Sequence, residues 1–201
     1  LSLFLYSKQL YCFYFVPCYV TIPFRMKLLT LKFILVFIYL ISSSASYAIQ
    51  QPNLKNLIIH KDPKKLEKIN FININNETIN LNKFKNSLII INFWATWCAP
   101  CIEEMPSLNR LQANTVFNNL KIIPINVGRD NVKKSKDFYK KLKINNLEIY
   151  FDKNVELANK FLLRGLPTTV FINKKGEEFA RIIGFVNFDD KKIIKWLQKY
   201  D

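Results

Sequence analysis

The chain has 201 residues, of which 50% are hydrophobic and 22% charged, so it is too apolar for a disordered chain and long enough for one or two domains. Thirty Lys and Arg residues against fifteen Asp and Glu residues give a formal net charge of +15, which raises the question of a nucleic-acid partner. Lys, Ile and Asn, whose codons consist mainly of A and T, number 25, 25 and 22, and this nucleotide bias is the simpler explanation of the charge. No nucleic-acid-binding motif accompanies the lysines, and we expect no nucleic-acid partner.

Residues 1–48 have the composition of a leader. Within residues 26–48, a basic start, an apolar run and small residues up to Ala48 form the pattern of a secretory signal peptide, with an uncleaved membrane anchor as the alternative. We interpret residues 1–25, which are broken by two prolines, as a doubtful upstream segment before a start at Met26. We therefore expect an exported, periplasmic protein, either released or tethered to the inner membrane by its N-terminal segment.

Strand and helix patterns alternate after residue 48. Residues 49–65 are mostly polar and predict an extended arm. Apolar runs predict strands over residues 71–74, 78–81, 87–94, 120–128, 147–151, 168–173 and 177–184, of which the first two and the last two form hairpins. Helical patterns follow the 87–94 strand as far as Gln112 and recur over residues 131–143, 155–163 and 189–200. This order predicts an α/β fold with a central mixed sheet flanked by helices.

Cys98 and Cys101 follow the 87–94 strand directly, in a C-x-x-C spacing that opens a helix. Unpaired N–H groups and the dipole at a helix N-terminus stabilise a thiolate, which lowers the pKa of the first cysteine. A disulfide that closes so short a loop adds little stability, so the pair predicts redox chemistry rather than a structural bridge. We expect Cys98 to be the exposed attacking thiolate and Cys101 the resolving thiol.

Metal binding is the alternative use of these two cysteines. A structural zinc site takes four ligands, and after residue 48 the chain offers only Cys98, Cys101 and His60 of the Cys and His type. We therefore expect no metal and no other cofactor, although Cu(I), which needs fewer thiolate ligands, stays open.

Two segments resemble the thioredoxin superfamily, specifically its exported TlpA/ResA-like branch. Residues 92–111, NFWATWCAPCIEEMPSLNRL, resemble the active-site segment, and residues 164–176, RGLPTTVFINKKG, resemble the cis-proline loop with its hairpin. The resemblance spans roughly residues 66–200 and implies a thioredoxin-like domain over residues 66–201, with an N-terminal β-hairpin. The stretch from Asp130 to Tyr150 resembles the insertion of this branch. The cysteine pattern of peroxiredoxins is absent, because Ile91 and Ala95 occupy the places of its Pro and Thr/Ser.

The resemblance also implies roles for individual residues. Cys98 and Cys101 would form the redox-active disulfide, with Cys98 as the nucleophile. The residues expected to bind the substrate are Trp97, Leu166, Pro167 and Thr168, with a cis peptide bond between Leu166 and Pro167.

Glu104 is the third expected catalytic residue. Classical thioredoxins carry a buried Asp where this chain has Asn92, which cannot titrate, whereas exported relatives carry an acid that matches Glu104. We hypothesise that Glu104 accepts the proton of Cys101, with its pKa raised by partial burial. The alternative is that Glu103 and Glu104 only complement the helix dipole.

The resemblance implies an enzyme, a thiol:disulfide oxidoreductase that reduces cysteines of target proteins during cytochrome c or oxidase maturation. Its partners would be disulfide-bearing protein substrates and a membrane thiol electron donor, and we expect a monomer. Two alternatives remain at this point, a disulfide-forming oxidase of the same fold and a Cu(I)-binding metallochaperone that uses the same cysteines.

Overall fold

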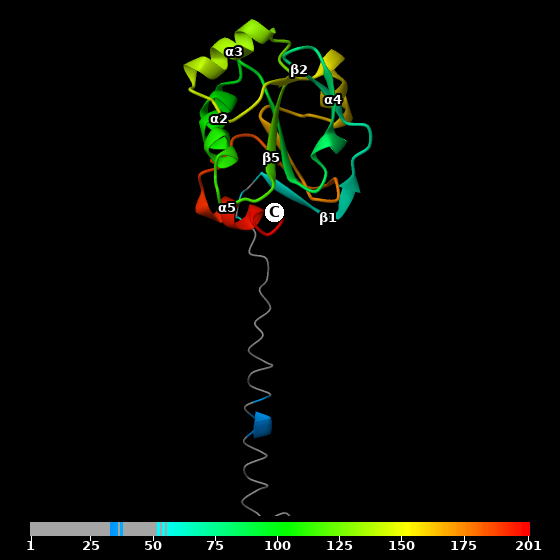
Figure 1. The fold of residues 1–201 in the computed structure, drawn as a ribbon, viewed down its shortest axis with the longest axis vertical. Helices are drawn as coiled ribbons and strands as arrows, with labels where there is room; N and C mark the ends of the chain where they lie inside the picture. The colour runs from blue at the N-terminus through cyan, green and yellow to red at the C-terminus, as the bar shows by residue number, and fades with distance from the viewer. Residues whose placement is uncertain (1–32, 36, 38–51, 53, 55) are drawn as a thin grey trace, which may run out of the picture. The chain divides into compact units, whose positions relative to one another are not determined.

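The computed structural model describes residues 33–35, 37, 52, 54 and 56–201. The chain divides into two units, residues 1–48 and 49–201, and the sheet belongs to the second (Figure 1). Apart from residues 33–35 and 37, the expected leader lies outside the described residues. Within the described ranges, no helix combines the length and the apolar character needed to cross a bilayer.

A mixed sheet of eight strands forms the centre of the second unit, in the order β1-β8-β7-β4-β5-β6-β2-β3. The strands are β1 (Leu57–Lys65), β2 (Asn70–Asn73), β3 (Thr78–Asn80), β4 (Leu88–Trp94), β5 (Leu120–Asn126), β6 (Tyr150–Phe151), β7 (Thr168–Ile172) and β8 (Glu177–Ile183). β5 is parallel to both β4 and β6, and the other pairings are antiparallel. The predicted mixed sheet and both predicted hairpins are therefore confirmed.

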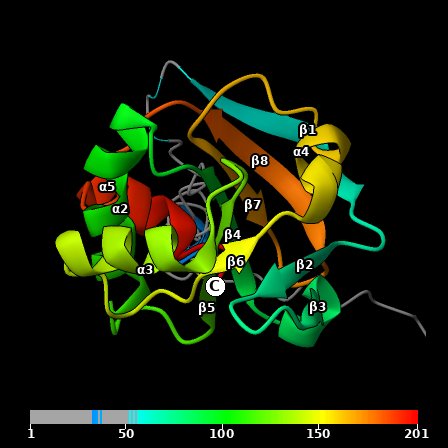
Figure 2. The ribbon, with the colours of Figure 1, turned by 90° about the horizontal axis from the view of Figure 1, so that it is seen from above.

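Helices lie on both faces of this sheet (Figure 2). They are α2 (Ala99–Gln112), α3 (Val132–Lys141), α4 (Glu156–Lys160) and α5 (Lys191–Leu197), with 3-10 turns at η1 (Leu81–Phe84) and η2 (Lys153–Val155). α2, α3 and α5 cover one face, and α4 lies on the other. The fold is thioredoxin-like, as the sequence predicts.

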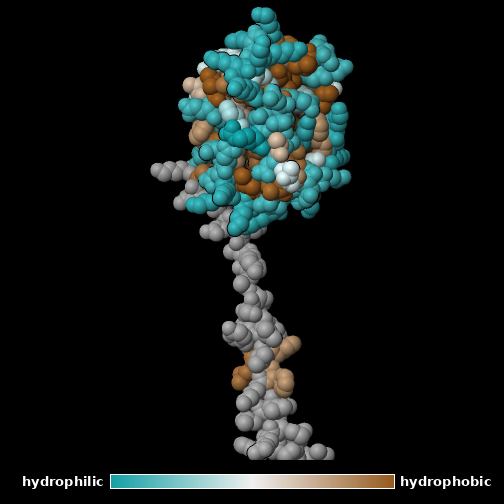
Figure 3. Space-filling view, turned by 60° about the vertical axis from the view of Figure 1, so that its left-hand side comes forward, coloured by the Kyte–Doolittle hydropathy of each residue, from teal (hydrophilic) through white to brown (hydrophobic). Residues whose placement is uncertain are grey.

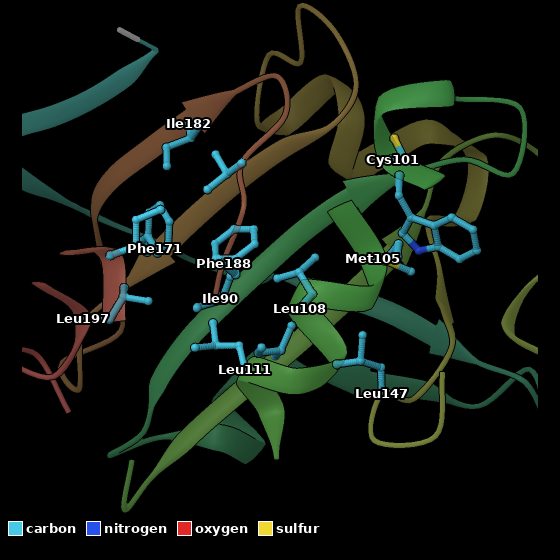
Figure 4. Packing of buried hydrophobic residues seen from close by; sticks show 14 of the residues in the cluster. Ile90, Cys101, Met105, Leu108, Leu111, Leu147, Phe171, Ile182, Phe188 and Leu197 are labelled. Atoms are coloured by element: carbon cyan, nitrogen blue, oxygen red, sulfur yellow. The ribbon is translucent and has the colours of Figure 1, made fainter. Parts of the chain in front are cut away.

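Every residue of β4 is buried, which accounts for a sequence that is apolar except for Asn92. Because side chains alternate along a strand, Ile90 and Trp94 enter one hydrophobic cluster, with α2, α3 and α5. Ile89, Ile91 and Phe93 enter the other, with α4. Figure 4 shows part of the first cluster, where Leu108 and Leu111 of α2 lie near Ile90 and Phe188.

The outer surface is mostly hydrophilic in the view of Figure 3, with hydrophobic side chains in separate patches. On α3, the exposed side chains are almost all lysines, whereas Ser135, Phe138 and Tyr139 are buried. The lysine-rich sequence of α3 is therefore the solvent-facing half of an amphipathic helix.

Three elements differ clearly from the sequence prediction, and one is the strand expected over 147–151, of which only Tyr150–Phe151 forms β6. Residues 57–65, within the segment expected as an extended arm, form the edge strand β1, which pairs with β8. A shift of register between Ile59 and Lys64 interrupts that pairing, so no regular alternation is visible in the sequence. The helix expected over 155–163 is shorter at both ends: Val155 has left-handed backbone, so α4 begins at Glu156, and α4 ends at Lys160, before Leu162, whose backbone is also left-handed.

A buried carboxylate fixes β1 to β8. Glu178 of β8 is only 2% exposed, and its Oε1 lies 2.7 Å from Nε2 of His60 on β1. Arg181 donates two hydrogen bonds to the same carboxylate, at 2.6 and 2.8 Å. Burial alone would raise the pKa of Glu178, but the hydrogen bonds from Arg181 and His60 outweigh it and hold the pKa below its usual value.

We predict that Glu178→Gln destabilises the protein by about 2 kcal/mol at pH 7, less than for a fully buried pair because His60 and Arg181 are partly exposed. Since the pKa of Glu178 is lowered, its contribution is present at neutral pH and is lost as the pH falls through that pKa. Denaturant unfolding at pH 7 and pH 3 measures this, and the difference between wild type and variant should shrink in acid. The exposed Glu156→Gln is the control, and an equal Glu178→Gln effect at both pH values would contradict the prediction.

Candidate functional site

The dithiol site lies where β4 passes into α2. Cys98 is the N-cap of α2, with extended backbone, and its Sγ accepts a hydrogen bond of 3.3 Å from the backbone N–H of Cys101. Pro100 occupies the first turn, where its missing N–H costs no hydrogen bond. Cys98 and Cys101 are joined in a disulfide. Cys101 and Met105 lie one turn apart on the buried face of α2 (Figure 4).

The exposure of Cys98 differs from the expectation. Cys98 is 4% exposed and Cys101 is 1% exposed, so neither cysteine is an open surface residue in this oxidised form. Both belong to the hydrophobic cluster under α2, where the disulfide joins them. The exposed side chain of the site is instead Trp97, at 66%.

The loop before β7 lies at the end of β4 from which the dithiol segment follows. The bond between Leu166 and Pro167 is cis, as predicted, and Thr168 pairs with Phe93 of β4, the strand that leads to Cys98. Thr168 is buried, and its hydroxyl donates to the backbone carbonyl of Gly165 at 2.7 Å, so its side chain holds the loop rather than facing outward. Over residues 56–201, neither the N–H nor the C=O of Leu166 has a hydrogen-bond partner.

Trp97 lies against the backbone of Gly128, at the end of β5. A Cβ atom at Gly128 would stand 3.0 Å from Nε1 of Trp97 and 2.5 Å from Cβ of Ala95. The second distance is shorter than any ordinary contact between carbon atoms, so this approach requires glycine. The sequence pattern gave no sign of this contact, because it joins two separate strand ends.

Asp130 connects the turn before Cys98 to α3. Its carboxylate accepts hydrogen bonds from the backbone N–H and the hydroxyl of Thr96, at 3.0 and 2.8 Å, and from Asn126 at 2.9 Å. Lys134 lies 2.6 Å from it. Burial alone would raise the pKa of Asp130, but the hydrogen bonds from Lys134, Asn126 and Thr96 lower it to about 2. Asp130 therefore carries a fixed negative charge near neutral pH, and sequence reasoning assigned it no role.

Glu104 lies one turn beyond Cys101 on α2 and is completely buried. One carboxylate oxygen accepts a hydrogen bond of 2.6 Å from the amide of Asn92, and the other accepts one of 2.8 Å from the backbone N–H of Val186. The same Asn92 amide nitrogen also donates to the hydroxyl of Thr169 on β7, at 3.0 Å. Residues from β4, β7 and the segment after β8 thus surround this carboxyl group.

Burial raises the pKa of Glu104 from 4.5 to about 8, and the hydrogen bonds from Val186 and Asn92 oppose that rise only in part. No cation is among the groups that contact its carboxylate oxygens in residues 56–201. A carboxyl with such a pKa can take up or release a proton near neutral pH, which an exposed Glu on a helix cannot.

The comparisons with known proteins agree with this geometry. Residues 63–177 match the sequence profile described as the AhpC/TSA family, which is more than half of the chain. The chain belongs to this family. It thereby has a thioredoxin-superfamily domain, in line with the resemblance seen in residues 92–111 and 164–176.

Several curated relatives carry the name thiol-disulfide oxidoreductase. The thiol-disulfide oxidoreductase ResA of Geobacillus kaustophilus is 31% identical over 110 residues, which cover 55% of this chain and 62% of that protein. The chain thus spans less than two thirds of this curated relative's length. A DsbF homologue from Corynebacterium diphtheriae has a TM-score of 0.60 at 24% identity, covering 75% of this chain and 96% of that one. StoA from Bacillus subtilis has a TM-score of 0.53 at 24% identity, covering 72% and 98%.

The burial of Glu104 gives a stability prediction. Below about pH 4.5 the carboxyl is protonated in the folded and the unfolded chain, whereas above about pH 8 folding must bury its charge. We expect the free energy of unfolding of Glu104→Gln to equal that of wild type at pH 4 and to exceed it by on the order of 3–5 kcal/mol at pH 9. The new amide can donate to the Asn92 oxygen, which has no partner in the described residues.

Denaturant unfolding of the oxidised protein at both pH values measures this difference. Glu103→Gln, on the exposed side of the same helix turn, should show no such pH dependence. A difference in the free energy of unfolding between Glu104→Gln and wild type that stays constant from pH 4 to pH 9 would contradict the raised pKa of Glu104.

Proposed function

We propose that this protein is an exported thiol–disulfide oxidoreductase that reduces disulfides in target proteins through Cys98 and Cys101. The observation that carries the proposal is the Cys98–Cys101 disulfide at the N-terminus of α2, directly after a fully buried strand. The helix dipole and the free N–H groups of the first turn stabilise a thiolate at Cys98 once the disulfide is reduced. The names of the ResA relatives support the same reaction class.

In the proposed reaction, the Cys98 thiolate attacks one sulfur of a target disulfide. The target S–S bond breaks, a mixed disulfide forms, and the other target sulfur leaves as a thiolate. Cys101 then loses its proton and attacks the sulfur of Cys98, which releases the second target sulfur and forms the Cys98–Cys101 disulfide. Two electrons pass from the dithiol to the target.

Glu104 is the proposed proton acceptor for Cys101. Side chains three residues apart are neighbours on one helix face, so the carboxyl lies beside the resolving cysteine. Its pKa of about 8 is close to the ordinary thiol value of about 8.5, so the proton transfer is nearly balanced in free energy. The carboxyl contacts no cation that would hold it permanently ionised.

Trp97 and the cis-proline loop are the proposed contacts with the target. Trp97 offers an exposed aromatic surface next to Cys98, and Leu166 offers a backbone N–H and C=O that no other described residue uses. An extended target segment can pair with Leu166 as an added strand, and Pro167 and Thr168 shape the loop that presents it.

The setting of the reaction is part of the proposal. Residues 26–48 would direct the chain out of the cytoplasm as a signal peptide or an anchor, and the domain would act in the periplasm as a monomer. There it would receive electrons from a membrane thiol carrier and reduce cysteines needed for cytochrome c or oxidase maturation. A reductant is needed for such cysteines because an oxidising compartment otherwise keeps them in disulfides.

The reduction potential tests the direction of electron flow. We expect about −270 mV or lower for the Cys98–Cys101 pair, as for a reductant. Equilibration of the purified protein in thiol redox buffers, with Trp97 fluorescence as the readout, measures this value. A potential near about −120 mV would contradict the proposed direction and identify a disulfide-forming oxidase instead.

The role of Glu104 is tested by kinetics. Glu104→Gln should slow the resolving step at pH 7 by about 100-fold, because the proton of Cys101 loses its acceptor. The rise of that rate with pH near 8 should also disappear. Stopped-flow fluorescence from pH 6 to pH 10 follows the step, with the exposed Glu103→Gln as control. An unchanged rate together with an unchanged Cys101 titration would rule out the role.

A further inference from the structure

A cavity of about 710 Å³ lies at the ends of β5 and β6, on the same edge of the sheet as the dithiol. β4, β5 and β6 are parallel, so their carboxyl ends meet at one edge, where ligands of such sheets commonly bind. Adjacent strands are about 4.8 Å apart, which places the cavity about 5–10 Å from the end of β4 that leads to Cys98. Asp130, which forms part of its wall, bonds to Thr96 in that turn.

The two acidic residues of this cavity are already engaged. Asp130 accepts hydrogen bonds from Thr96 and Asn126 and pairs with Lys134. The carboxylate of Asp152 accepts the backbone N–H groups of Leu157 and Ala158, at 2.9 and 2.8 Å. The oxygens of both carboxylates therefore already accept hydrogen bonds from the protein, and neither carboxylate is left free to bind a ligand.

Arg129 is the cation of the cavity lining, and it is exposed. Throughout residues 56–201 no carboxylate lies within ion-pair distance of it, and its guanidinium donates no hydrogen bond. Its backbone is left-handed, with φ of 59°, a conformation that a non-glycine residue adopts infrequently. Lys153 of η2, which lies between the lining residues Asp152 and Asn154, is also exposed. Lys133 of the adjoining α3 pairs with Asp137 at 3.7 Å.

Further residues with left-handed backbone line the same cavity. Asn154 and Val155 also line it, with φ of 55° and 60°. The left-handed conformation is least favourable for a β-branched residue such as Val155, and such strain concentrates where a surface serves a function. Val155, Val127 and Val132 give the cavity an apolar wall beside Arg129.

The geometry points to a second binding site, for an acidic segment of the target polypeptide, which deepens the proposed function and rests on it. A carboxylate of the target pairs with the guanidinium of Arg129, and a neighbouring apolar side chain packs against Val127, Val132 and Val155. Gly128, the neighbour of Arg129, lies against Trp97, which precedes Cys98. An extended chain advances about 3.3 Å per residue, so the acidic residue stands about three residues from the target cysteine. This site selects acidic targets among the many disulfides of an oxidising compartment.

The test uses pairs of disulfide peptides that differ at one position, where one peptide has an acidic residue and the other has the corresponding amide. This position lies three residues before a cysteine in one pair and three residues after it in a second pair. For the wild-type full-length protein, we expect a KM about three- to tenfold lower for the acidic peptide, with similar kcat. The preference should shrink at 1 M salt, where the Debye length is about 3 Å.

Arg129→Asn should bring the ratio of the two KM values to about one, and asparagine tolerates the left-handed backbone of this position. Lys143→Asn is the matched control, because Lys143 is also an exposed cation with left-handed backbone, at φ of 54°, beyond the opposite end of α3. The control should keep the preference of wild type.

Equal KM values for the two peptides in wild type would overturn this inference and leave the proposed function standing. An equal loss of preference in Lys143→Asn and Arg129→Asn would also overturn it, because net charge would then explain the effect. Failure of wild type to reduce either peptide would overturn the proposed function, and this inference with it.

Discussion

A carboxyl group buried without a cation is costly, and in this protein the architecture of the site is arranged around one. Glu104 is fully enclosed, and its two oxygens are held by Asn92 of β4 and by the backbone of Val186. Through Asn92 the same network reaches Thr169 on β7, just after the cis-proline. The three elements that must keep their positions around Cys98 and Cys101 are thus linked through a single side chain of α2. Any movement of α2 away from the sheet would break these bonds.

Much of the fold is predictable because its elements have a regular apolar period. β4 shows an apolar run interrupted only by Asn92, since the two hydrophobic clusters bury both of its faces. α3 shows the opposite pattern, because only one side of it is buried, so its lysines could be interpreted as a solvated face from the sequence. The edge strand β1 was not visible in this way, since a break in its register removes the alternation that predicts a strand.

The same distinction between features visible in the local sequence and features that depend on packing applies to the candidate site. Cys98, Cys101, Glu104 and the cis bond before Pro167 lie in two continuous segments, so local motifs were enough to locate them. The exposure of Cys98 and the inward bond of Thr168 depend on the packed structure, and neither could be predicted from the segments alone. Gly128 and Asp130 act only where the connection after β5 comes close to the turn before Cys98. Nothing in the local sequence of these residues predicts that the two segments are in contact.

The two buried carboxyl groups near the dithiol show how the surroundings assign different roles to similar side chains. Asp130 has four hydrogen bonds from cationic and neutral donors, which outweigh its burial and lower its pKa to about 2. Glu104 has two bonds from neutral donors and no cation, so burial prevails and its pKa rises to about 8. Between these values the first group is always charged, and only the second can exchange a proton. The fixed charge suits a structural tie between the active-site turn and α3, and the titrating group suits the resolving thiol. If the two environments were exchanged, the dithiol would stand beside a carboxylate that could never take its proton.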